Sequence, residues 1–89
     1  MVVEIEKYLP QRNYIMNAYT THLIKEAAVK AFTSDEARYK NYVVVVDMGM
    51  NDFSVIDYDN NFDALIPTVA EIDDAAYIVD RKLIVTEFS

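Results

Sequence analysis

Carboxylates are the residues of this sequence whose number and spacing most clearly suggest a chemical role. Between Asn41 and Asp80 there are nine Asp and Glu residues and no Lys or Arg, although the whole chain carries a formal net charge of only −7. Residues 1–40 carry five acids and six bases, so the excess negative charge lies entirely in the second half. Such an uneven distribution indicates a surface that attracts a positively charged partner.

The spacing of these acids predicts where they would gather. Asp57 and Asp59 are two residues apart in a segment with strand character, so their side chains should share one face about 6.6 Å apart. Most of the other acids fall at or near predicted turns and strand ends. We therefore predict a partner-binding acidic surface made of Asp52, Asp57, Asp59, Asp63, Asp73, Asp74 and Asp80. The alternative is that the acids only keep the protein in solution.

The sequence offers little for catalysis. It contains no Cys, one His and one Gly, which excludes cysteine nucleophiles and a glycine-rich phosphate loop. His22 lies in a predicted helix, one turn before Glu26, and this spacing is typical of a surface pair. Two carboxylates acting as acid and base would need a cleft, which so short a chain does not readily form. We expect a non-enzymatic protein without a cofactor.

One segment imitates a calcium-binding loop. Residues 57–63 place oxygen-bearing side chains at positions 1, 3, 5 and 7, as at the start of an EF-hand loop. The pattern fails at Phe62, which stands where the sharp turn needs Gly, and at Thr68, where the bidentate Glu should be. We therefore predict no metal site.

The first half of the chain predicts helices. Residues 11–32 are good helix formers, and we expect one long helix whose buried stripe includes Ile15, Tyr19, Leu23 and Ala27. The spacing of Thr33 and Glu36 is that of a capping box and predicts a short helical turn over residues 35–39. Residues 2–9 could form an opening strand or lead into the helix, and the alternation of apolar and polar side chains slightly favours the strand.

The second half predicts strands. β-Branched and aromatic runs indicate strands over residues 42–47, 52–58, 76–79 and 83–88, with turns at 48–51, 59–61 and 80–82. Residues 62–72 stay open among strand, helix and loop, because Pro67 disfavours a central strand while Thr68 and Glu71 repeat the capping-box spacing. The fold class is α+β, with one long N-terminal helix packed on a mostly antiparallel sheet of about four strands. Residues 1–89 should form a single domain.

Composition also bounds the location and the partners. No apolar run approaches the ~20 residues of a membrane span, so we expect a cytoplasmic protein without a membrane partner. The acidic half would repel phosphates, which argues against direct nucleic-acid binding. A domain this small has little stability to spare and can gain some by self-association, which makes a homodimer possible.

The residue 41–80 charge run, the absence of Cys and the seven Tyr in 89 residues give the chain a recognisable character. It resembles the small DNA-mimic and host-takeover proteins of bacteriophages, in size, charge and composition but in no shared motif. The resemblance implies an inhibitor that mimics DNA and occupies a basic DNA-binding protein in the host bacterial cytoplasm. A nucleoid protein of the HU type is the preferred target and a CRISPR effector the second. The alternative is a small homo-oligomeric assembly module, joined through an exposed strand edge, with acids only for solubility.

Overall fold

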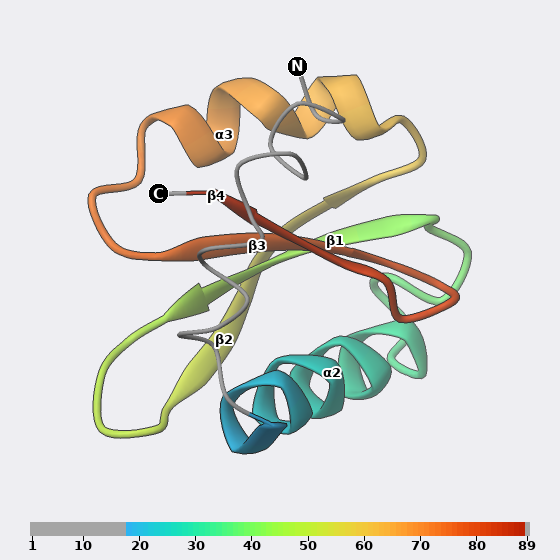
Figure 1. Ribbon diagram of the computed structural model, residues 1–89. Coiled ribbons are helices and arrows are strands. Elements are labelled where there is room, and N and C mark those ends of the chain that lie inside the picture. Colours follow the sequence, from blue (N-terminus) through green and yellow to red (C-terminus); the bar gives the residue numbers. More distant parts are fainter. Residues whose placement is uncertain (1–17, 89) are drawn as a thin grey trace.

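The computed structural model describes residues 18–88, and the predicted opening strand lies outside them. So does the first part of the predicted long helix, residues 11–17. Figure 1 shows the elements in chain order: helix α2 (Ala18–Phe32), strands β1 (Tyr42–Asp47) and β2 (Phe53–Asp59), the 3-10 helix η1 (Phe62–Leu65), helix α3 (Ile66–Ala70), and strands β3 (Ala76–Asp80) and β4 (Val85–Phe88).

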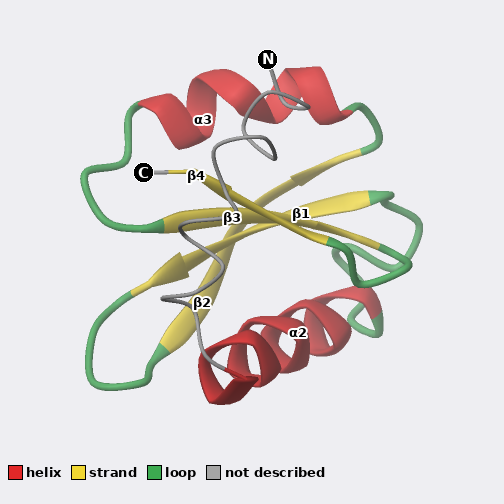
Figure 2. Cartoon of the chain, in the orientation of Figure 1, coloured by secondary structure: helices red, strands yellow, loops and turns green. Residues whose placement is uncertain are grey.

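The four strands form one sheet in the order β2-β1-β3-β4, and all three pairings are antiparallel. Helix α2 covers one face of this sheet and α3 covers the other, which makes three layers (Figure 2). The predicted α+β class is therefore confirmed. Neither the order of the strands nor a cover for the second face was predicted.

Strands β1 and β3 are central because their side chains are apolar on both faces. Val43 and Val45 pack with α2, whereas Val44 and Val46 pack with the η1–α3 segment. The uninterrupted run of four valines therefore meets the requirement of a strand buried on both sides.

Helix α2 is confirmed over its described part, but its buried face differs from the predicted one. The buried side chains of α2 are Ile24, Ala28 and Phe32. Of the predicted stripe, Ala27 packs half-buried against this core, whereas Tyr19 is 58% exposed. Leu23 is only half-buried, at the edge of the contact. Alanine stands at 27, 28 and 31, so the apolar pattern fits two neighbouring stripes, and the larger Ile24 and Phe32 decide between them.

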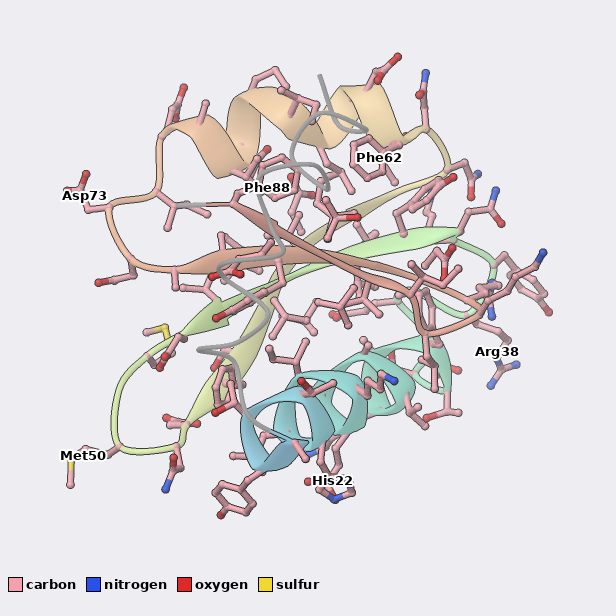
Figure 3. All side chains as sticks on the ribbon, in the orientation of Figure 1. His22, Arg38, Met50, Phe62, Asp73 and Phe88 are labelled. Atoms are coloured by element: carbon pink, nitrogen blue, oxygen red, sulfur yellow. The ribbon has the colours of Figure 1, made fainter. Side chains whose placement is uncertain are left out.

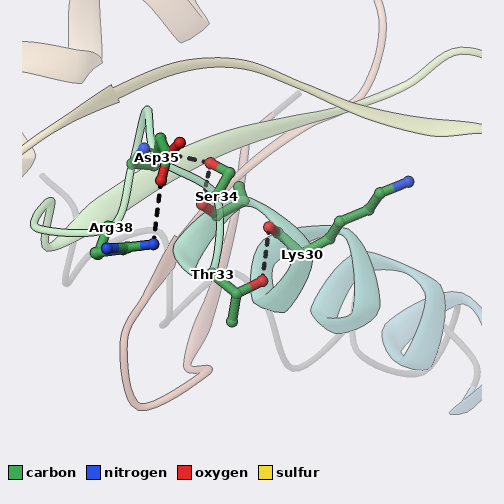
Figure 4. A network of polar contacts seen from close by, with 7 residues as sticks. Lys30, Thr33, Ser34, Asp35 and Arg38 are labelled. Atoms are coloured by element: carbon green, nitrogen blue, oxygen red, sulfur yellow. Dashed lines mark hydrogen bonds and ion pairs between the residues drawn. The ribbon is translucent and has the colours of Figure 1, made fainter.

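Residues 35–39 form turns, in agreement with the short helical turn predicted there, and do not extend into a regular helix. The Thr33 hydroxyl donates to the carbonyls of Val29 and Lys30, both at 3.0 Å, and so ends α2 (Figure 4). Ser34 Oγ accepts from the Ala37 N–H at 3.4 Å, which is the bond a capping residue makes. The capping side chain is therefore Ser34 and not Thr33.

The segment that the sequence left open, residues 62–72, is helical up to residue 70. Asn61 caps η1 by accepting from the Asp63 N–H at 3.0 Å, and Pro67 occupies the first turn of α3, where no N–H is needed. Phe62 stands edge-on to Tyr42, with ring centroids 5.5 Å apart, and also lies against Phe88 (Figure 3).

The predicted turns at 48–51 and 80–82 join antiparallel strands into hairpins, with strand limits shifted by one or two residues. The β1–β2 loop has three successive residues with positive φ, Gly49 (91°), Met50 (57°) and Asn51 (63°). In the β3–β4 turn, Asp80 Oδ1 accepts from the N–H groups of Lys82 and Ile84 at 2.9 and 3.0 Å. Strand β4 begins at Val85 and not at 83, because this turn extends through residue 84.

Candidate functional site

The antiparallel register divides the acidic residues between two ends of the sheet. Tyr42 pairs with Asp59 and with Asp80, which places these two carboxylates at one end. At the opposite end, Asp47 of β1 pairs with Phe53 of β2, and Val46 of β1 pairs with Ala76 of β3. A strand of six residues separates its ends by about 17 Å. The predicted acids therefore do not form one continuous row.

One end of the sheet gathers acids from two loops. Asp52 lies in the β1–β2 loop, Asp73 and Asp74 lie in the loop between α3 and β3, and all three are exposed. The Asp47 N–H donates to Ala75 O at 3.0 Å, which holds the two loops side by side. We call Asp47, Asp52, Asp73 and Asp74 the acidic end. The two loop segments that carry it, residues 47–52 and 71–74, contain no base.

Asp47 is a member of the acidic end that sequence reasoning missed. It is the last residue of β1, half-buried, and its Oδ1 accepts from the Gly49 N–H at 2.8 Å. The sequence could have indicated this, because Asp47 directly precedes the predicted turn at 48–51 and Asp52 directly follows it. A hairpin brings such a pair to the same end of a sheet.

Two methionines project from the same end. Met50 is 99% exposed in the β1–β2 loop (Figure 3), and Met48 is 57% exposed. Thioether side chains adapt to irregular apolar surfaces and recur at protein-binding sites. The acidic end therefore combines carboxylates with flexible apolar side chains.

Asp57 and Asp59 lie on the face that α3 covers, and internal hydrogen bonds occupy both. Asp57 Oδ2 accepts from the Thr68 hydroxyl at 3.0 Å, and its Oδ1 accepts from the Tyr58 N–H at 2.8 Å. Asp59 Oδ1 accepts from the Asn61 N–H at 2.9 Å. Both residues are half-buried. These carboxylates hold the η1–α3 segment against β2. Because they are half-buried and already hydrogen-bonded, they are less accessible to a partner.

The opposite end of the sheet carries charges of both signs. Asp63 is exposed there, and half-buried Asp80 is occupied by the β3–β4 turn. Basic residues of the same region are Arg38, Lys40, Arg81 and Lys82, and Arg38 Nη2 forms an ion pair with Asp35 Oδ1 at 3.1 Å. This end is therefore close to neutral. Of the predicted seven acids, only Asp52, Asp73 and Asp74 remain exposed on loops without a base, and Lys30 of α2 lines the hollow next to Asp52.

The Asp57–Thr68 contact gives a test of the structural role of this carboxylate. We expect Thr68→Val to lower the free energy of unfolding by about 1 kcal/mol, because it removes one hydrogen bond from a half-buried carboxylate. In a double-mutant cycle, Asp57→Ala should then cost less in the Thr68→Val background than alone. Urea unfolding followed by circular dichroism measures both quantities. Fully additive costs would contradict the contact.

The EF-hand-like segment has a different backbone from that of a calcium loop. Asn61 caps η1, and Phe62 begins it, so the second half of the imitation is helical. Within residues 18–88, no three His, Asp or Glu side chains converge in a way that could hold a metal ion. His22 is exposed, and its Nε2 lies 3.9 Å from Glu26 Oε2, at the limit of an ion pair.

Comparisons of the chain with protein families, with curated proteins and with solved structures found no match. In the described part of the chain, no helix has the length and apolar character needed to cross a membrane.

Proposed function

We propose that this protein is a non-enzymatic binding protein whose acidic end contacts the basic surface of a nucleic-acid-binding protein. The observation that carries the proposal is the concentration of exposed Asp52, Asp73 and Asp74 on two adjoining loops that contain no base. Among the described residues, the ion pairs are His22–Glu26 and Arg38–Asp35, so none neutralises these carboxylates.

The mechanism is competition with nucleic acid. Carboxylates on two adjoining loops at one end of the sheet take the place of phosphates against Lys and Arg side chains of the partner. Such complementarity raises the association rate, and salt weakens it because the charges are exposed. The methionines of the β1–β2 loop add apolar contact once the charges have brought the surfaces together.

The kind of partner follows from the bacteriophage resemblance in charge and size. A dimeric nucleoid protein of the HU type is the preferred target, and a CRISPR effector is the second. In either case the chain acts as a DNA mimic: it occupies the groove that DNA would fill and inhibits the partner.

The test is displacement of duplex DNA from a purified HU-type dimer by the full chain, at low and at high salt. We expect displacement at low salt and its loss at high salt. The double variant Asp73→Asn/Asp74→Asn should weaken displacement roughly tenfold, because two exposed charges are worth about 1–2 kcal/mol at low salt.

A matched control is Asp57→Asn/Asp59→Asn. It removes the same amount of charge from residues that internal hydrogen bonds occupy, so displacement should stay close to that of the unchanged chain. Failure of the chain to displace DNA at low salt would overturn the proposed target. Equal loss in the two double variants would show that total charge, and not the acidic end, determines binding.

A further inference from the structure

A groove lies along the outer edge of the sheet, between α2 and β2 (Figure 1). It has a volume of about 590 Å³ and adjoins a second hollow of about 410 Å³, with which it shares Ala27, Lys30 and Phe53. Three successive residues of β2, at positions 53–55, all line the groove. Because successive side chains of a strand point to opposite faces of the sheet, a groove that all three line must run along the backbone edge of the strand.

The backbone of β2 has one free side in the described part of the chain. Strand β2 is at the end of the strand order and pairs with β1 on its inner side. The outward N–H and C=O groups of such an edge strand can pair with another chain. Residues 53–55 pair with β1 in regular register, and Ile56 is the extra residue of a β-bulge, since Val45 pairs with Val55 and Val44 with Asp57. A further strand could therefore pair with residues 53–55 and would end at the bulge.

Acidic side chains outnumber basic ones around the groove and the adjoining hollow. The lining residues that the structure describes include one base, Lys30, and three acids, Glu26, Glu36 and Asp52. All four of these side chains are exposed. Asp52 also belongs to the acidic end, so the groove continues that surface along β2. These charges favour an occupant that carries Lys or Arg, and they disfavour a second copy of this acidic chain.

We propose that an extended basic segment of the partner lies in this groove and adds to β2 as a further strand. Its backbone hydrogen-bonds to the outer edge of residues 53–55, in the way that extended peptides add to an exposed sheet edge. Its Lys or Arg side chains reach Glu26 on the helix and Asp52 at the start of the strand. The inference rests on the proposed function for the class of partner, but it adds a second contact surface that can be tested without DNA.

The probe is a labelled peptide, acetyl-Lys-Val-Lys-Val-Lys-Val-Lys-amide, titrated with the full chain at low salt. We expect the fluorescence anisotropy of the peptide to rise to a plateau, and the NMR amide shifts of residues 53–55 to change over the same range. The same peptide with N-methyl groups on its backbone amides has equal charge but cannot donate to a strand. It should bind about tenfold more weakly.

Charge variants of the chain test the position of the peptide. Glu26→Gln/Asp52→Asn should weaken binding about fivefold at low salt, because both carboxylates face the groove. Lys30→Gln should strengthen binding about twofold, because it removes a repelling charge. The matched control is Asp63→Asn/Glu71→Gln, which removes two exposed charges beside the η1–α3 layer and should change the affinity less than about twofold.

Absence of peptide binding at low salt would overturn the inference, and so would equal binding of the N-methylated peptide. Equal losses in the two double variants, or amide shifts confined to residues 71–74, would also contradict it. The proposed function fails separately. A chain that binds the peptide along β2 but displaces no DNA from the HU-type dimer retains the groove and loses the proposed target. A chain that displaces DNA but does not bind the peptide shows the reverse. Circular dichroism verifies the fold of each variant.

Discussion

Replacing Ile78 by alanine is expected to lower the free energy of unfolding by about 3 kcal/mol. Ile78 is 1% exposed in the central strand β3 and packs against Val44, Leu65 and Val69. It is thus the point where the sheet meets the η1–α3 layer. The shortened side chain would leave a cavity that close-packed neighbours fill only in part. The loss is large for a domain whose total stability is about 5–10 kcal/mol.

The measurement is urea unfolding, with the transition midpoint compared at constant slope. Ile84→Ala is the matched control, because the same side chain is removed from a 55% exposed site in the adjoining turn. It should cost less than about 1 kcal/mol. Similar costs for the two variants would contradict the burial of Ile78 under α3.

The strands and the long helix were predictable because their signals are local. The run Tyr42–Asp47 is β-branched and apolar at four successive positions, and no other element explains it. The helix stripe was harder to place, since alanines at 27, 28 and 31 satisfy two registers equally. The choice depends on how Ile24 and Phe32 fit against the sheet, and this information is not in the helix sequence.

The helical character of residues 62–70 was only half visible in the sequence. Asn61 as a cap and Pro67 in a first turn are helix signals, but Pro67 also fits an edge strand. The second face of the sheet decides in favour of the helix, because Leu65 and Val69 cover apolar side chains of β1 and β3 there. Covering that face is a tertiary requirement that no local pattern expresses.

The acidic surface was predicted from charge alone, and charge does not say which carboxylates the fold itself uses. Asp57 accepts from Thr68, eleven residues away, and Asp80 closes its own turn. The role of Asp57 cannot be read from spacing, because it depends on how the chain returns. Asp80, by contrast, accepts from the N–H two residues ahead, which is a local bond that suits the turn predicted at 80–82. The division of the acids between two sheet ends likewise needs the strand order, which the sequence left open.

Arg81 in the β3–β4 turn bonds to carbonyls that lie 44 and 43 positions earlier in the sequence, so its removal should weaken the attachment of that earlier segment. Arg81 Nη2 donates to Ala37 O at 3.2 Å and to Arg38 O, and its guanidinium carbon stands 4.8 Å from the centroid of the Phe32 ring. One exposed arginine thus ties the β3–β4 turn to the segment that follows α2. The two carbonyls that Arg81 binds belong to the turn between the end of α2 and the start of β1.

We expect Arg81→Ala to lower the free energy of unfolding by about 2 kcal/mol, from charge-assisted hydrogen bonds and a cation–π contact that are partly screened by solvent. Arg81→Lys keeps the charge but not the planar fork, so it should recover less than half of the loss. Lys82→Ala removes an equal charge from a side chain without a hydrogen bond or ion pair in the described part of the chain, and should cost less than about 0.5 kcal/mol.

Thermal and urea unfolding of these three variants separate geometry from charge. If Arg81→Ala and Lys82→Ala cost the same, the effect is one of net charge in a chain that is already acidic. If Arg81→Lys is as stable as the unchanged chain, a single positive charge suffices and the fork is not used. Only a ranking with Arg81→Ala lowest, Arg81→Lys intermediate and Lys82→Ala unaffected agrees with a guanidinium that binds two carbonyls and one aromatic ring at once.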